Sequence, residues 1–181
     1  MGAVNTTKPN SLSSSTMGRA EAEQFLFHEA SLIDQRRFSE WLELFSPEGR
    51  YWVPANSFDI NPENHVSLIN DSRARLEDRV YRMGLTTMYS QNPLSRTVHM
   101  ISNVELSASD SDHQSVSSCF LIGSVREGDW RQNGLGMDSQ PVLFGRYEHS
   151  LRKEDGHWRI LMKKVLLLQN DVPVGNITFL L

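Results

Sequence analysis

The chain contains one cysteine, Cys119, among 181 residues. A single thiol cannot form a disulfide within the chain, and this cysteine usage fits a reducing compartment, so we expect a cytoplasmic protein. The sequence also lacks any apolar run near the roughly 20 residues that a membrane-spanning helix needs. Its first residues, MGAVNTTKPNSLSSST, have no apolar segment of the kind that marks a secretory signal.

An excess of positive charge is absent as well. The formal net charge is −4 and 22% of the residues are charged, which gives no general attraction for nucleic acid or for an anionic membrane. The length fits one domain with a sizeable core. The Ser-, Thr-, Asn- and Pro-containing start predicts a disordered or extended arm over residues 1–18, and we expect a single folded domain over residues 19–181.

Apolar residues at three- and four-residue intervals predict helices in the first half of the chain. Residues 20–33 carry one apolar face, and a shorter helix is predicted over residues 38–45. RYWVP predicts a short strand, and residues 55–70 predict a loop. A third helix is predicted over SRARLEDRVYRMG, with Asn70 or Asp71 as its N-cap.

Strand-like alternation begins at about residue 96. In TVHMISNVEL, apolar residues at alternate positions predict one face made of Val98, Met100, Val104 and Leu106, with His99 on the opposite, more polar face. SVSSCFLIGSVR is apolar on both faces at its centre, which is typical of a central strand that is covered on both sides.

The remaining segments complete the prediction of fold class. EDG between two strand-like runs predicts a tight hairpin, and VGNITFLL predicts a final strand. Helices come first and consecutive antiparallel strands follow. The order predicts an α+β domain in which the N-terminal helices pack on a strongly curved, mainly antiparallel sheet.

The histidines show no metal-ligand spacing. They stand at positions 28, 65, 99, 113, 149 and 157, and none forms a helical HxxxH pair. A Rieske iron–sulfur centre needs two cysteines and two histidines, so one cysteine excludes it. We expect this chain to bind no metal and no cofactor. Strongly apolar residues follow Cys119, so we expect a buried, unreactive thiol.

Acid–base chemistry by Asp34 and His99 is the one enzymatic hypothesis that the residues support. Asp34 ends the first predicted helix, and a helix lying across the sheet would bring its carboxylate to His99. An Asp–His pair in a semi-closed pocket can move protons at carbon or oxygen. The structural alternative is an N-cap role for Asp34 in the second helix, with His99 as a hydrogen-bonded strand residue.

Three arginines follow one side of the third predicted helix. Arg75, Arg79 and Arg82 lie at i, i+4 and i+7, and Asp71 and Asp78 each stand four residues before one of them. The interleaved acids neutralise most of the positive charge. We therefore expect a solvated or interfacial ion-pair surface rather than a phosphate or RNA site.

Four segments, in this order, resemble the small (β) subunits of bacterial aromatic-ring-hydroxylating dioxygenases: FLFHEASLIDQRRFSEWLELFSPEGRYWVP, RLEDRVYRM, NPLSRTVHMISNV and FGRYEHSLRKEDGHWRILMKKVLLLQN. The resemblance spans about residues 20–181. It implies a cone-shaped α+β fold of the nuclear-transport-factor-2-like (NTF2-like) type. Chains of that family commonly end in aromatic residues, whereas this one ends Phe179-Leu180-Leu181, an apolar end that still fits burial.

The resemblance also implies partners and cofactors. In that family a larger α subunit holds the [2Fe-2S] Rieske cluster and the mononuclear Fe(II) that activates O₂, usually with three copies of each chain and the β chains in contact as a trimer. Ferredoxin and reductase proteins supply electrons from NAD(P)H, and the complex forms a cis-dihydrodiol on an aromatic ring. The β chain is mainly structural and has no active site, which favours a structural role for His99.

Aromatic and arginine side chains are enriched at protein interfaces. On that basis and the resemblance, we expect subunit contacts from Trp41, Tyr51, Trp52, Arg79, Arg82 and Arg96. The alternative for the whole chain is a self-sufficient cone-fold isomerase or dehydratase that uses Asp34 and His99. A third class, a ligand-binding module without catalysis, would show a small-molecule pocket and no larger partner.

Overall fold

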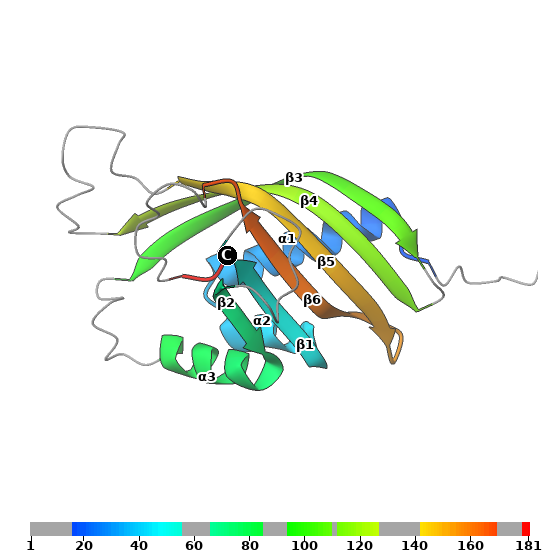
Figure 1. Cartoon of the computed structure of the whole chain (residues 1–181), viewed down its shortest axis with the longest axis horizontal. Coiled ribbons are helices and arrows are strands. Elements are labelled where there is room, and N and C mark those ends of the chain that lie inside the picture. The colour runs from blue at the N-terminus through cyan, green and yellow to red at the C-terminus, as the bar shows by residue number, and fades with distance from the viewer. Residues whose placement is uncertain (1–15, 56–65, 85–93, 110–111, 127–141, 170–178) are drawn as a thin grey trace, which may run out of the picture.

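The computed structural model describes residues 16–55, 66–84, 94–109, 112–126, 142–169 and 179–181. Helices come first and strands dominate the second half (Figure 1). The elements are α1 (Arg19–Asp34), α2 (Phe38–Glu43), β1 (Phe45–Pro54), β2 (Ser67–Ser72), α3 (Arg73–Gly84), β3 (Ser95–Ser109), β4 (His113–Arg126), β5 (Val142–Glu154) and β6 (His157–Leu167). Most of the predicted N-terminal arm and most of the predicted final strand lie outside these ranges.

The described strands form one mixed sheet in the order β2-β1-β6-β5-β4-β3. Neighbours pair antiparallel except β1 and β6, which run parallel and join distant parts of the sequence. The sheet is open and strongly curved, and the helices lie beneath its arch (Figure 1). The predicted α+β class is confirmed. None of the described helices is long and apolar enough to cross a membrane.

The core fills the space between α1, α2 and the concave face of the sheet. Leu26 and Ile33 of α1 are buried there, as the apolar periodicity predicted. The ring of Trp41 meets those of Phe45 and Tyr51 edge-on, at centroid distances of 4.9 and 5.9 Å. Such edge contacts add to the burial of apolar area, so α2 is fixed to the start of the sheet.

The ends of the sheet follow the turn chemistry of the sequence. Asp155 and Gly156 have φ values of 50° and 83° and join β5 to β6, which confirms the predicted hairpin. At the C-terminus, the Tyr51 hydroxyl donates to the Leu181 carbonyl oxygen at 3.2 Å and accepts from the Leu181 N–H at 3.1 Å. Leu180 and Leu181 are buried, as predicted for an apolar end, but they lie outside any strand.

A bulge in β3 corrects the predicted faces of that strand. Asn103 has a φ of 50°, and the register with β4 shifts between Ser102 and Glu105. Asparagine tolerates this left-handed conformation, and the extra residue exchanges the two faces. Val104 therefore points into the core while Val98 and Met100 point outward, so the prediction of one continuous apolar face was wrong.

The predicted cap of the third helix was also wrong. Asn70 and Asp71 lie in β2, where they pair with Trp52 and Tyr51 of β1. The end of the predicted loop over residues 55–70 is therefore strand. Sheet pairing outweighs the local capping preference here, because Asn70 and Asp71 both have partners in the antiparallel ladder with β1.

Gly145 offers a test of the packing between β5 and β6. A Cβ at this position would overlap the Leu166 carbonyl oxygen, which is backbone and cannot swing away. We expect Gly145→Ala to lower the free energy of unfolding by about 1–3 kcal/mol, measured by urea denaturation. Gly123→Ala is the control, since its Cβ would lie 3.5 Å from Val98 Cγ1. Equal losses in both variants would contradict the close approach at Gly145.

Candidate functional site

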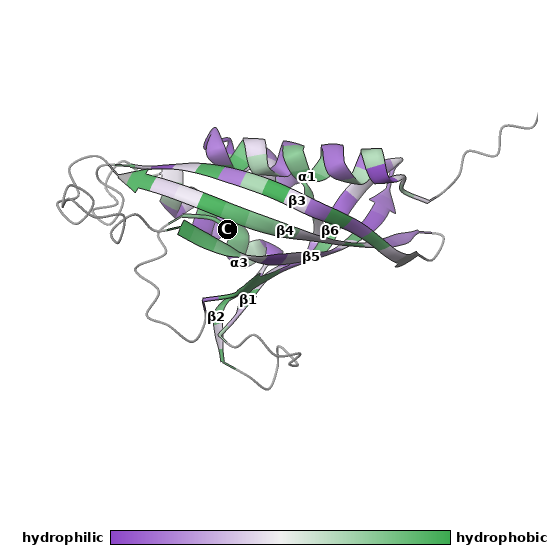
Figure 2. Ribbon diagram, turned by 90° about the horizontal axis from the view of Figure 1, so that it is seen from above, coloured by the Kyte–Doolittle hydropathy of each residue, from purple (hydrophilic) through white to green (hydrophobic). Residues whose placement is uncertain are grey.

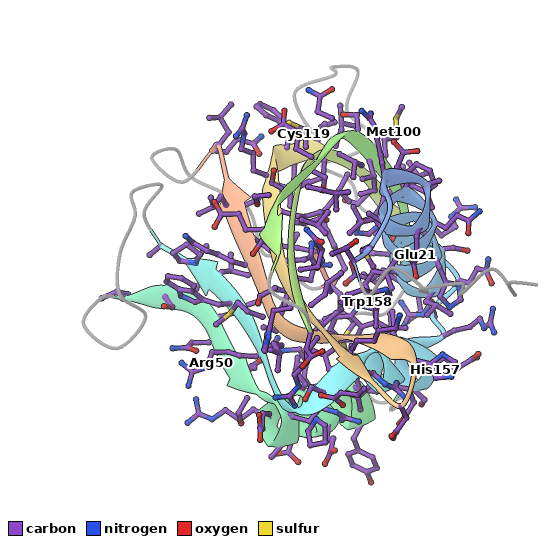
Figure 3. The ribbon with its side chains drawn as sticks, turned by 90° about the vertical axis from the view of Figure 1, so that its right-hand side faces the viewer. Glu21, Arg50, Met100, Cys119, His157 and Trp158 are labelled. Atoms are coloured by element: carbon purple, nitrogen blue, oxygen red, sulfur yellow. The ribbon has the colours of Figure 1, made fainter. Side chains whose placement is uncertain are left out.

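Three carboxylates of α1 bind the concave face of the sheet at successive points along the helix. Near its start, Glu21 accepts a hydrogen bond of 2.9 Å from the Trp158 indole N–H of β6 (Figure 3). Glu29 in the middle and Asp34 at the end make further contacts with other strands. The helix is therefore fixed across the sheet by polar contacts as well as by apolar packing.

Asp34 binds three groups of β3. Its Oδ1 accepts from the Thr97 hydroxyl at 2.8 Å and lies 2.6 Å from His99 Nδ1, while its Oδ2 accepts from the His99 backbone N–H at 2.9 Å. The expected approach of Asp34 to His99 is confirmed. The N-cap role was wrong, because α2 begins after Arg37 with no side-chain cap. The end of α1 turns the carboxylate toward the strand instead.

The Asp34–His99 pair has the geometry of an acid–base pair. Burial raises the pKa of Asp34, but the hydrogen bonds from the ring and backbone of His99 and from Thr97 more than offset this, so its pKa lies below the usual value. The ionised carboxylate orients the imidazole. His99 Nε2 is buried and has no hydrogen-bond partner among the described residues.

Glu29 gathers a second polar cluster in the interior. Its Oε1 accepts from Lys163 Nζ at 2.8 Å and from the Trp41 indole N–H at 3.1 Å, and its Oε2 lies 3.0 Å from His149 Nε2. Lys163 Nζ stands 4.5 Å from the centroid of the Tyr147 ring. One carboxylate thus connects α1, α2, β5 and β6.

The charges of this cluster depend on one another. Burial alone would raise the pKa of Glu29, but Lys163 and His149 hold it well below the usual range. Burial lowers the pKa of Lys163, and Glu29 opposes that shift. Burial also raises the pKa of Tyr147 well above its usual value, so its hydroxyl stays neutral. The result is an enclosed ion pair in which each charge needs the other.

Sequence reasoning missed the Glu29 cluster, although a signal was present. Glu29 shares the helix face of Ala22, Leu26 and Ile33, at four- and three-residue steps, and so falls within the apolar stripe. Lys163 likewise interrupts the apolar run ILMKKVLLL. A charge within each of two apolar patterns is the mark of a buried pair.

The arginines of α3 form the expected ion-pair surface in part. Arg79 Nη2 lies 2.6 Å from Asp71 Oδ2, although these residues are eight positions apart. Arg82 Nε donates to the backbone oxygen of Asp78 at 3.3 Å, and Arg75 Nη1 donates to that of Asn70 at 3.5 Å. Because Asp71 lies in β2, it reaches the second turn of α3 and not the first.

The residues expected at subunit contacts divide into two groups. Trp41, Tyr51 and Trp52 are packed inside this chain. Arg82 and Arg96 are exposed, and Arg79 is half-buried. Contact of any of them with a partner stays a prediction.

Cys119 and the histidines bear on metal binding. Cys119 is half-buried on the outer face of β4, so the expectation of a buried thiol was wrong. Strand alternation places Phe120, not Cys119, in the core. In the part of the chain that the structure describes, no three His, Cys, Asp or Glu side chains gather as metal ligands would. Cys119 contacts the Asn103 side-chain amide at 3.8 Å instead.

These features define the class of protein. Helices beneath a strongly curved, open sheet, with polar side chains turned into the concavity, are the NTF2-like cone fold. The model of the family described as "Ring hydroxylating beta subunit" matches residues 28–173. The chain belongs to this family of ring-hydroxylating β subunits.

Relatives and a solved structure agree with the assignment. The small oxygenase component of the p-cumate 2,3-dioxygenase system of Pseudomonas putida is 30% identical over 166 residues, covering 90% of this chain and 87% of its own. The small subunit of 2-halobenzoate 1,2-dioxygenase of Burkholderia cepacia is 35% identical over 157 residues, covering 82% and 86%. The crystal structure of the benzoate 1,2-dioxygenase β subunit of Burkholderia mallei superposes with a TM-score of 0.70 at 26% identity, covering 91% of this chain and 99% of its own.

Removal of the Glu29 charge tests the buried cluster. We expect Glu29→Gln to lower the free energy of unfolding by about 3 kcal/mol or more, because Lys163 is left buried without its counter-charge. Glu23→Gln on the same helix is the control, since Glu23 pairs with Arg19 at the surface and such pairs contribute about 1 kcal/mol at most. Chemical denaturation of both variants measures the difference. A loss for Glu29→Gln no larger than that for Glu23→Gln would contradict the account.

The pH dependence of stability provides a second test of the Glu29 cluster. Lys163 and His149 hold the pKa of Glu29 in the folded chain below the ordinary value of 4.5. The ionised Glu29 carboxylate therefore contributes fully to the free energy of unfolding above its unfolded-state pKa. That contribution is lost as the pH falls from the unfolded-state pKa toward the folded-state pKa. The stability difference between the wild-type chain and Glu29→Gln should be constant near neutral pH and should shrink below about pH 4.5. A difference that grows on acidification would contradict the assignment.

Proposed function

We propose that this chain is the non-catalytic β subunit of a multicomponent aromatic-ring-hydroxylating dioxygenase in the cytoplasm. It supports the assembly of larger α subunits, in a complex with three copies of each chain. Those α subunits would convert an aromatic substrate to a cis-dihydrodiol with O₂ and with electrons from NAD(P)H, delivered by ferredoxin and reductase proteins. The observation that carries the proposal is the family match over residues 28–173.

The interior of the chain supports a structural role. Both enclosed carboxylates of α1 are engaged: Asp34 with Thr97 and His99, and Glu29 with Lys163 and His149. These contacts fix α1 to the sheet and make the domain rigid. A rigid support is what the assembly of a larger subunit requires.

The iron groups of the family do not fit the described part of this chain. Cys119 stands alone on the outer face of β4, and a Rieske cluster requires two cysteines and two histidines. His99 and His149, the two described histidines that are turned inward, each contact a different carboxylate. We therefore place the Rieske cluster and the mononuclear iron in the α subunit.

The Asp34–His99 pair favours a second candidate, a self-sufficient isomerase or dehydratase. The 2.6 Å contact and the unpartnered, buried His99 Nε2 are what a general base needs. The same contact also anchors α1 to β3, since Asp34 binds Thr97 and the His99 backbone as well. Activity distinguishes the two candidates, because only the second predicts turnover by the isolated chain.

Affinity purification from the native host tests the proposed function. We expect the tagged chain to co-purify with a larger chain in equal numbers, with iron and sulfide in the preparation, as measured by native mass spectrometry and metal analysis. The chain purified alone should be colourless and inactive on aromatic substrates. A colourless assembly of this chain without a larger partner would overturn the proposal.

Variants of the Asp34–His99 pair separate support from catalysis. In the reconstituted complex we expect Asp34→Asn and His99→Ala to leave turnover per iron nearly unchanged while the chain loses about 1–3 kcal/mol of stability. Thr97→Val is the control, since it removes one Asp34 contact and leaves the histidine in place. A loss of turnover of about 100-fold or more in fully assembled, iron-loaded His99→Ala complex would favour acid–base catalysis instead.

A further inference from the structure

The outer face of the sheet carries an exposed apolar patch. It comprises six side chains of three neighbouring strands: Val98, Met100, Leu121, Val125, Val142 and Phe144. Each is exposed by 38% or more, and Met100 by 61%. These residues are hereafter called the outer patch.

Strand register makes the outer patch continuous. Met100 lies opposite Leu121 of β4, which lies opposite Phe144 of β5. In the next row, Val98 and Val142 flank Gly123. Directly opposed residues on one face lie about 5 Å apart and touch, so the patch is one apolar surface and not a scatter of single side chains.

No described element of the chain covers the outer patch. The helices lie beneath the arch (Figure 1), and no helix crosses β4 on the outer side (Figure 2). Met100 and Cys119 both lie on this outer side of the sheet (Figure 3). The sequence predicted that the β4 segment is covered on both faces, and the described residues of this chain cover its concave face alone. A contiguous apolar surface of this kind marks an interaction site.

Charges at the two ends of the outer patch are opposite. On β3, exposed Arg96 lies beyond Val98 at one end, and exposed Glu105 lies at the other, about 30 Å away at the rise of a strand. Arg146 of β5 lies between the patch and the Glu105 end, beside Cys119 in the register. Exposed Glu148 is paired with Lys164 at 3.1 Å. The exposed charges of β3 thus give the face a positive end and a negative end.

We propose that the outer patch is the surface through which copies of this chain pack against one another. Copies joined head to tail bring the Arg96 end of one to the Glu105 end of the next, and a ring closes when the rotation from one copy to the next is a whole fraction of a full turn, without a shift along the axis. The apolar patches of all copies then face the axis of the ring. The inference deepens the proposed trimeric assembly, on which it rests, by naming its contact face.

The proposed contact is tested by placing a charge in the outer patch and measuring the mass of the protein in solution. We expect the purified full-length chain to run at a multiple of its 20.7 kDa monomer mass. Met100→Glu and Leu121→Glu should run as monomers with unchanged circular dichroism, and should still unfold cooperatively. Leu68→Glu is the matched control, because Leu68 is 52% exposed on β2, at the opposite edge of the sheet from β3. The mass of the Leu68→Glu assembly should match that of the wild type.

Three results would overturn the proposal. One is a wild-type chain that is monomeric at all concentrations, and another is an assembly that survives both outer-patch substitutions. The third is loss of the larger subunit from Leu121→Glu preparations while the small-chain assembly persists, which would assign the face to the larger subunit. The first two leave the co-purification test of the proposed function unaffected, so the two failures are distinguishable.

Charge exchange tests the head-to-tail arrangement. Arg96→Glu and Glu105→Arg should each weaken self-association about two- to fivefold, as expected for exposed pairs, and the double variant should restore it. Cys119 reports the contact in the unmodified chain, since it neighbours Leu121 on the same face. Its reaction with a thiol reagent should slow as the assembly forms. A double variant weaker than both single variants, or a thiol equally reactive in monomer and assembly, would contradict the arrangement.

Discussion

The enclosed contact between Glu29 and Lys163 is the interaction on which the rest of the fold depends. A buried carboxylate and a buried ammonium are each costly alone, so the pair forms only when α1 and β6 are both in place. Trp41 and His149 supply further hydrogen-bond partners of the carboxylate. The contacts of Glu29 determine where α1 crosses the sheet. At that position Glu21 reaches Trp158 and Asp34 reaches β3.

A helix fixed at three points explains why the chain suits a supporting role. The charged side chains on the concave face of the sheet pair with one another. The exposed apolar surface lies on the convex face. There the outer patch meets no other described part of the chain. The concave face thus carries the contacts that stabilise the chain, and the convex face carries the proposed subunit contacts. Membership in the ring-hydroxylating β-subunit family agrees with that division.

Local patterns predicted the parts of the fold that local physics decides. The helix ending at Asp34 and the Asp-Gly hairpin at Gly156 follow from periodicity and turn chemistry, and both are present. The bulge at Asn103 escaped prediction because one left-handed residue, invisible to a two-residue period, exchanges the faces of β3. The approach of Asp34 to His99 was predictable as a possibility only. Lys163 reaches Glu29 from 134 residues away in the sequence, and such a pair depends on the tertiary fold.

A double-mutant cycle on Glu29 and Lys163 tests the central claim most directly. The quantity measured is the free energy of unfolding of the wild-type chain, Glu29→Gln, Lys163→Met and the double variant, all near neutral pH. Each single variant strands one buried charge, whereas the double variant strands neither. We therefore predict that the double variant loses less stability than the sum of the single losses, by more than about 1.5 kcal/mol. Losses that simply add would show that the pair does not hold the helix to the sheet.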